Sequence, residues 1–229
     1  EIRPRDWSSD VCSSDLRSRA HPSRAANSTS KTPREPKRAS GATARSRDLE
    51  ICILAGGLSS RMGRDKARLR LGERTMLACV RAAARAAGWR VRVIRRDLLP
   101  RCGPLGGVWT AFQRSRASRL MFLSCDMPFV SPELVRAVAE DGRAAVFTRS
   151  VEGAGFPFGL DRSLLPRLAQ ALMERRFSLQ AFARRVRAGS VRLPAGRQSE
   201  LRNLNTPREF QRAKFEFRAK ALARRARAE

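Results

Sequence analysis

The stretch ICILAGGLSSRMGRDK, residues 51–66, predicts a buried β-strand that runs directly into a glycine-rich loop. Residues 51–54 are all apolar, which is typical of a strand covered on both faces. Gly56 and Gly57 follow at its carboxyl end. Glycines let the backbone approach a ligand closely, and successive backbone N–H groups can surround phosphate oxygens. The stretch therefore predicts an α/β fold with a phosphate-binding loop after its first strand.

Two cations, Arg61 and Lys66, belong to this loop and would face a triphosphate. Lys66 is the only lysine between positions 38 and 213, in a chain whose basic residues are nearly all arginine. That exception suggests a need for a compact ammonium group. The loop matches neither the Walker A pattern nor G-x-G-x-x-G. The alternative interpretation is a glycine-rich turn before an exposed basic stretch.

Short apolar runs alternate with helical patterns along the rest of the chain. This alternation implies right-handed crossovers and a mostly parallel sheet, with ligands at the carboxyl ends of its strands. The predicted strands cover 51–54, 91–94, 120–125 and 144–148; the predicted helices cover 75–87, the stretch after a turn at 103–107 up to 115, 132–140, two stretches between 161 and 187, and the residues after 207.

A carboxylate, Asp126, comes directly after the predicted strand 120–125 and two residues before Pro128. A carboxylate at the carboxyl end of a strand is well placed to hold Mg²⁺ against phosphate oxygens. The alternative is a cap for the helix that begins near residue 132.

A third polar cluster, Asn-Leu-Asn-Thr-Pro at 203–207, precedes the last helix. Thr206 would cap that helix, and Pro207 would occupy its first position. Capping does not explain Asn203 and Asn205, which are two of only three asparagines in the chain and are spaced to face one side of an extended segment.

The composition excludes several kinds of chemistry. The single histidine is His21, so the predicted folded part holds no histidine triad or histidine-bearing zinc site. The five cysteines form no C-x-x-C pair, and their odd number argues against a disulfide scaffold, so we expect a reducing cytoplasm. No uncharged run reaches the roughly 20 residues that span a bilayer, and we expect no membrane partner.

Residues 1–48 are rich in serine, with scattered arginine and proline and no apolar periodicity, so we expect this leader to be disordered. Within it, residues 6–16 (DWSSDVCSSDL) resemble the translation of a sequencing-library adaptor. We expect that part to be an artefact and the natural protein to begin before residue 49.

Four motifs resemble, in order, those of the molybdenum cofactor guanylyltransferases of the nucleotidyltransferase superfamily. They are L-A-G-G-x-S-S-R-M-G-x-D-K from Leu54, G-P-L-G-G from Gly103, C-D-M-P from Cys125 and N-x-N-T-P from Asn203. The resemblance covers about residues 50–211. It implies a Rossmann-like three-layer α/β/α sandwich with a mostly parallel sheet, formed by one nucleotidyltransferase domain over 49–229 that ends in a basic helix.

The resemblance also implies an activity, in which GMP passes from Mg·GTP to the terminal phosphate of the molybdenum-bound pterin and pyrophosphate leaves. No protein nucleophile is needed, which agrees with a body that lacks histidine. Mg²⁺ is then the cofactor, GTP and the molybdenum-pterin are the substrates, and a pterin-delivery protein and recipient molybdoenzymes are possible partners.

Site residues follow from matching positions. The resemblance implies backbone contacts from Leu54, Ala55 and Gly56 to the nucleotide, with Gly57 permitting the close approach. Lys66 would neutralise phosphate charge together with Arg61, and Asp126 would bind Mg²⁺ and the nucleotide. Asp97 matches, more loosely, an aspartate that contacts GTP.

The chain departs from the family in one respect. Between the helix at 75–87 and the G-P-L-G-G motif it has only the strand 91–94, whereas relatives have two strands with a helix between them. The fold therefore lacks one strand-helix unit, either as a natural short form or through an internal deletion, and with it an asparagine that helps bind guanosine in relatives.

Other functions stay open beside this one. Cytidylyltransferases for the same cofactor typically read L-A-A-G in the first loop and have aspartate where Asn205 stands, and sugar-phosphate nucleotidyltransferases share only part of the motif set. The net charge of +27 and the basic stretch 210–227 favour nucleic-acid binding as a further alternative, although we expect no nucleic-acid partner. A catalytically dead relative is the last alternative.

Overall fold

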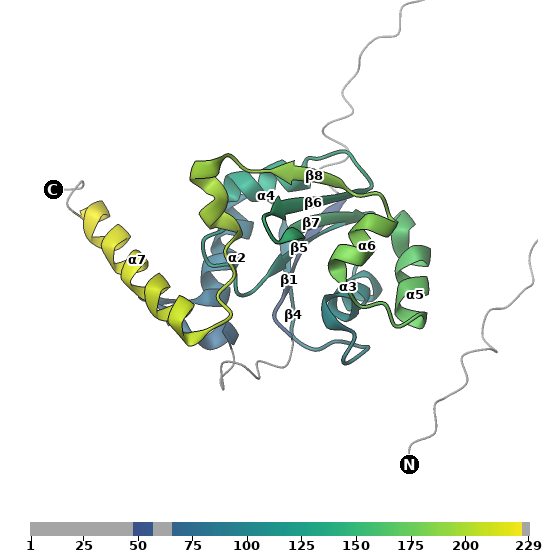
Figure 1. Ribbon diagram of the computed structural model, residues 1–229, viewed down its shortest axis with the longest axis horizontal. Coiled ribbons are helices and arrows are strands. Elements are labelled where there is room, and N and C mark those ends of the chain that lie inside the picture. Colours follow the sequence, from purple (N-terminus) through teal and green to yellow (C-terminus); the bar gives the residue numbers. More distant parts are fainter. Residues whose placement is uncertain (1–47, 57–65, 226–229) are drawn as a thin grey trace, which may run out of the picture. The chain divides into compact units, whose positions relative to one another are not determined.

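The computed structural model describes residues 48–56 and 66–225, with the side chains of Lys66 and of residues 220–225 left out (Figure 1). The predicted leader lies outside this part except for residue 48. Gly57 and Arg61 also lie outside the described residues.

A six-stranded sheet forms the centre of the described part (Figure 1). Its strand order is β4 (Arg90–Ile94), β1 (Leu49–Leu54), β5 (Arg119–Ser124), β7 (Gly153–Asp161), β6 (Ala145–Ser150) and β8 (Gly189–Arg192). Only β7 runs antiparallel to its neighbours, so the sheet is mostly parallel, as predicted. A short hairpin of β2 (Arg70–Leu71) and β3 (Arg74–Thr75) stands apart from it.

Helices cover both faces of this sheet, and alternate residues of β1 meet the two layers. Ile51 and Ile53 share a core cluster with α2 (Met76–Ala86) and α4 (Pro132–Ala139). Cys52 and Leu54 share another with α3 (Gly103–Arg114), α5 (Leu165–Met173) and α6 (Leu179–Arg185). The predicted three-layer α/β/α sandwich is therefore confirmed. The short 3-10 helices are η1 (Lys66–Arg68), η2 (Arg162–Leu164) and η3 (Ala195–Leu201).

The last helix, α7 (Pro207–Arg225), packs beside the hairpin rather than on the sheet (Figure 1). Its Ala213 and Phe217 join a small apolar cluster with Leu71 and Met76, and the Phe217 ring lies 5.2 Å from that of Phe129 between centroids. No helix in the described part is both long and apolar enough to cross a membrane.

The structure corrects two details of the predicted elements. The G-P-L-G-G motif is the first turn and a half of α3 rather than a turn before it, because Pro104 fits the start of a helix and Gly103 adopts a positive φ of 56° there. The central strand β7 was not predicted.

A single strand, β4, lies between α2 and α3, as the sequence predicts. It pairs with β1 and is an edge strand of the sheet.

Candidate functional site

Three strands end side by side where the first loop begins. The backbone N–H of Ala55 donates to the Ile94 carbonyl at 2.8 Å, and the N–H of Cys125 donates to the Leu54 carbonyl at 3.1 Å. These bonds extend the parallel ladders β1·β4 and β1·β5 by one residue. The carboxyl ends of β4, β1 and β5 are thus fixed relative to one another, and Gly56 leaves β1 between the other two.

Asp97 lies beside Gly56 and the start of α3. A Cβ placed on Gly56 would lie 3.0 Å from the Arg95 carbonyl oxygen and 3.5 Å from Asp97 Oδ1, and one placed on Gly107 would lie 3.3 Å from the same carboxylate oxygen. Burial raises the pKa of Asp97, and the positive charge of Arg114 lowers it to a smaller extent. The carboxylate therefore stands in a partly dehydrated position between the first two motifs.

The glycines of α3 are required by close contacts. A Cβ on Gly106 would lie only 2.6 Å from the backbone oxygen of Leu99, and a Cβ on Gly107 would lie 3.1 Å from Leu54 Cδ1. Helix α3 therefore approaches β1 and the loop 95–102 as closely as the backbone allows, which brings its amino-terminal turn to the site.

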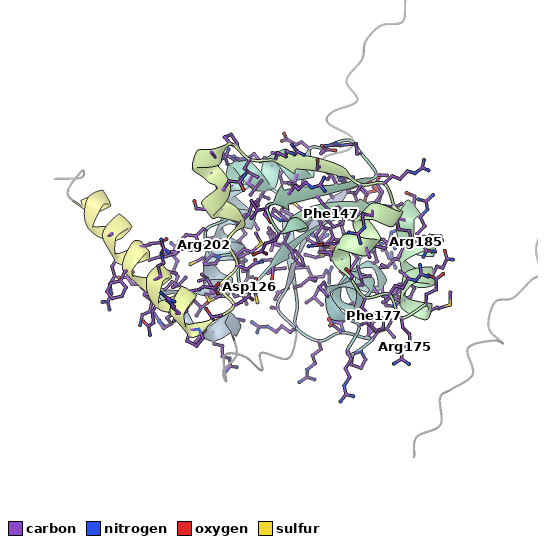
Figure 2. All side chains as sticks on the ribbon, viewed as in Figure 1. Asp126, Phe147, Arg175, Phe177, Arg185 and Arg202 are labelled. Carbon is purple, nitrogen blue, oxygen red and sulfur yellow. The ribbon has the colours of Figure 1, made fainter. Side chains whose placement is uncertain are left out.

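Asp126 follows β5, two residues after Ser124. The Ser124 hydroxyl donates to Asp126 Oδ1 at 2.6 Å. The backbone oxygen of Asp126 accepts the N–H of Leu204 at 2.9 Å, which fastens the N-L-N-T-P segment directly to this strand end. Figure 2 shows Asp126 and Arg202 drawn between the sheet and α7, whereas Arg175 and Arg185 lie by α5 and α6. The third and fourth motifs thus meet at Asp126.

The segment 203–207 is held in place from α7. Thr206 Oγ1 accepts the N–H of Glu209 at 3.2 Å, and Glu209 Oε2 accepts the N–H groups of Asn205 and Thr206 at 2.7 and 2.8 Å. This reciprocal pattern is a capping box, so the predicted cap at Thr206 is confirmed. Capping accounts for the backbone of Asn205 and leaves its side chain beside a cavity.

A cavity of about 590 Å³ opens next to this segment, and Asn203 and Asn205 both line it. A second cavity of about 300 Å³ adjoins it, sharing Ser150, Glu152, Leu201 and Asn203 with the first. Asn203 Oδ1 is buried and has no hydrogen-bond partner within the described part of the chain. The asparagines predicted to face one side therefore border a space large enough for a small-molecule substrate.

The chemistry of these donors suits a hard cation bound together with phosphate. No group of three or more His, Cys, Asp or Glu side chains that could hold a metal by themselves occurs among residues 48–56 and 66–225. Asp126 supplies a carboxylate at the end of β5, and the Ser124 hydroxyl donates to its Oδ1. Mg²⁺ commonly takes one or two carboxylates and completes its shell with substrate phosphates and water, which fits this set.

The structure thus brings together Leu54, Ala55, Gly56, Asp97 and Asp126 at one edge of the sheet. The side chain of Lys66 is not described, although its backbone begins η1. Arg119 begins β5 at its amino end, away from this edge, and its guanidinium pairs with Asp161. The binding roles of all these residues stay predictions.

The sequence missed Ser124, Arg149 and Arg192. Ser124 comes directly before the C-D-M-P motif. Only its distance to Asp126 in the structure distinguishes it from any other serine at the end of a strand. The two arginines carry no signal in a chain so rich in arginine, since the strands that hold them were predicted incompletely or not at all.

Comparison with known proteins gives one family. The model of the MobA-like NTP transferase domain matches residues 51–190. A probable molybdenum cofactor guanylyltransferase from Carboxydothermus hydrogenoformans is 28% identical over 186 aligned positions, covering 72% of this chain and 94% of the relative. That alignment is longer than 72% of 229 residues, so it includes positions that this chain lacks.

A second relative and one solved structure complete the comparison. The molybdenum cofactor guanylyltransferase of Xanthomonas euvesicatoria is 30% identical over 174 positions, covering 70% of this chain and 91% of the relative. The crystal structure of molybdopterin-guanine dinucleotide biosynthesis protein A from Archaeoglobus fulgidus superposes with a TM-score of 0.57 at 18% identity, covering 75% and 99% of the two chains.

Proposed function

The chain belongs to the MobA-like NTP transferase family, and from this premise we propose that it transfers GMP from GTP to the terminal phosphate of a molybdenum-bound pterin, releasing pyrophosphate. The domain that does so is proposed to span 49–229. Cytoplasmic location, Mg²⁺ as the cation, and pterin-delivery and recipient proteins as partners belong to the same proposal.

One observation carries it: the described parts of the four motifs converge on a single edge of the sheet. Gly56 approaches Asp97 and the first turn of α3, and Asp126 is bonded through its backbone to the N-L-N-T-P segment. A glycine loop, two carboxylates and a substrate-sized cavity at the carboxyl ends of parallel strands are the parts that phosphoryl transfer needs.

The proposed mechanism needs positioning and charge stabilisation, with no covalent intermediate on the protein. Ala55 and Gly56 would hold the nucleotide phosphates by their backbone groups, and Lys66 and Arg61 would stabilise charge on the leaving pyrophosphate. Asp126 would hold Mg²⁺, which when bound polarises the α-phosphate. The acceptor phosphate would approach from the cavity beside Asn203, opposite the leaving group, for an in-line displacement.

The test is transfer of radiolabel from α-labelled GTP or CTP to molybdenum-loaded pterin by the full chain. We expect GTP to be preferred, and a clear preference for CTP would replace the guanylyl assignment with a cytidylyl one. The absence of the guanosine-binding asparagine predicts a higher KM for GTP than in relatives with the complete sheet edge.

Asp126→Asn should lower kcat by about 100-fold or more, the size expected when a group that stabilises transition-state charge is lost. The backbone bond to Leu204 does not involve the side chain, so the variant should keep its fold, as circular dichroism would show. Glu133→Gln, at an exposed position on α4, is the matched control and should retain activity. Equal activity of Asp126→Asn and wild type would contradict the assignment.

A further inference from the structure

The larger cavity lies beside the segment 203–207, which is bonded to Asp126 through Leu204. It begins at Asn203 and Asn205 and continues to the carboxyl ends of β6 and β8, where Arg149 and Arg192 form part of its wall. Both strands run parallel to β5, so these ends lie at the same edge of the sheet as Asp126. The cavity therefore connects the proposed reaction centre with a second charged region.

Arg149 and Arg192 stand directly beside each other. They are paired residues in the parallel ladder between β6 and β8, and both are exposed. Within the described part of the chain neither forms an ion pair or a side-chain hydrogen bond. Like charges side by side on neighbouring strands are unfavourable, so the pair costs stability unless an anion lies between the two guanidinium groups.

The other charges of this cavity are mostly engaged. Arg202 is paired with Glu216, and its guanidinium lies over the Phe129 ring at 4.2 Å from the centroid. Glu209 is occupied by the capping box. Glu152, on the turn after β6, is exposed on the same wall and is the one carboxylate there without a contact within residues 48–56 and 66–225. Within the described part of the chain, Arg149 and Arg192 are thus two cations of this cavity without a side-chain partner, and Glu152 is one carboxylate without such a partner.

The two arginines stand on strands that are two and three positions away from β5, the strand that ends at Asp126. Neighbouring strands lie about 4.8 Å apart, so β6 is about 10 Å and β8 about 14 Å from β5 across the sheet. Asn203 also lines the cavity, and its buried Oδ1 has no hydrogen-bond partner in the described part of the chain. The cavity thus offers a hydrogen-bond acceptor and a pair of guanidinium groups, and the segment that carries Asn203 is bonded to Asp126 through Leu204.

We propose that Arg149 and Arg192 form an oxyanion site that binds an anionic oxygen group of the acceptor at the end remote from its reacting phosphate. The inference rests on the proposed function for the identity of the acceptor. The anion site itself rests on the paired arginines and the cavity. A planar guanidinium donates two parallel hydrogen bonds to an oxyanion, and two such groups can hold one from both sides.

Steady-state kinetics with molybdenum-loaded pterin test the inference in the variant Arg149→Gln/Arg192→Gln. We expect the KM for the acceptor to rise at least about tenfold, while kcat and the KM for GTP stay within about twofold of wild type. The matched control is Arg81→Gln/Arg167→Gln, which removes the same charge from exposed positions on α2 and α5 and should change none of the three constants.

Calorimetric titration with inorganic phosphate gives a second readout that does not need transfer. The nucleotide site is first filled with a non-hydrolysable GTP analogue and Mg²⁺. We expect the arginine variant to bind phosphate at least about fivefold more weakly than wild type and the control variant to match wild type.

The outcomes separate the two proposals. If wild type transfers no GMP but loses phosphate binding in the arginine variant, the proposed function fails and the anion site stands. If transfer occurs and neither the acceptor KM nor phosphate binding changes, the anion site is overturned. A fall in kcat with an unchanged acceptor KM would place the pair at the reacting phosphate and contradict the remote assignment.

Discussion

Asp126 and Ser124 form the shortest side-chain contact at the proposed reaction centre. The hydroxyl donates to Oδ1 at 2.6 Å and so fixes the rotation of the carboxylate at the end of β5. Ser124 is therefore a positioning residue, because it acts on the cation and nucleotide only through Asp126.

Ser124→Ala should release the carboxylate, lower kcat about threefold to tenfold and raise the Mg²⁺ concentration needed for half-maximal rate. Ser124→Thr keeps a hydroxyl and should restore most of the Mg²⁺ dependence. Titration of the rate with Mg²⁺ measures the effect, and Ser118→Ala at the amino end of β5 is the control. A Mg²⁺ dependence identical to wild type in Ser124→Ala would remove the positioning role.

Asp97 illustrates a conflict between binding and stability. Its folded pKa is raised above the ordinary value by burial, with Arg114 lowering it to a smaller extent. A carboxyl with a raised pKa stabilises the fold below its ordinary pKa and loses that contribution as the pH rises through the folded value. At neutral pH the ionised Asp97 therefore destabilises the protein.

Asp97→Asn should raise the Tm modestly at pH 7, and the gain should disappear as the pH falls below the ordinary aspartate pKa of about 3.9, where the wild-type carboxyl is protonated in both states. The same variant should raise the KM for GTP. Thermal melts across this pH range measure the first effect. A Tm difference that is constant with pH would indicate a packing cause and would contradict the electrostatic explanation.

Helix α3 depends on two glycines where it crosses β1. Gly106→Ala would place a methyl group 2.6 Å from the Leu99 backbone oxygen, which cannot move as a side chain could. We expect a loss of about 1–3 kcal/mol in unfolding free energy, since overpacking outweighs the gain in helix propensity. Gly196→Ala, where no atom lies within 4 Å, is the matched control and should be close to neutral in urea unfolding. Equal stability of the two variants would show that the loop 95–102 moves to accommodate the added methyl group.

The parallel elements could be predicted from the sequence, and the antiparallel one could not. The apolar runs of β1 and β5 and the spacing of Met76, Leu77, Val80 and Ala84 in α2 match their burial in the structure. Strand β7 carries three glycines and Pro157, which normally argue against a central strand. It is tolerated because the β6·β7 register shifts between Phe147 and Thr148, so that the ladder skips residues 156 and 157.

The residues of the site, like the strands, could be predicted from the sequence only in part. Motif residues at strand ends were predictable, because parallel strands bring their carboxyl ends to one edge. Arg149 and Arg192 were not, because their pairing depends on β8, a strand of four residues whose sequence Gly-Ser-Val-Arg has little apolar pattern.

At the scale of the whole molecule, the charge of +27 is partly balanced by local ion pairs. Several arginines of the described part are paired with carboxylates at distances of 2.5–3.0 Å, among them Arg92, Arg119, Arg143, Arg185, Arg197 and Arg202. The excess positive charge instead suits small anionic substrates.

Filter binding to single-stranded DNA should therefore show only weak retention, with a Kd of about 10⁻⁵ M or higher at physiological salt, lost on raising the salt further. The decrease in GTP affinity over the same salt series provides the comparison. Tight DNA binding with a steep salt slope would revive a nucleic-acid function.

The place of β4 at the end of the sheet has a consequence for the protein in concentrated solution. Among the described strands β4 has a neighbour on one side only, so its outer backbone groups can template pairing with another molecule. Arg90 and Arg92 alternate along it, and two such borders meeting edge to edge would oppose guanidinium to guanidinium. Arg92 is paired with Glu50, so Arg90 is the arginine that would carry most of this repulsion. The repulsion would thus oppose self-association through this edge, and multivalent anions that bridge arginines would weaken it and promote self-association.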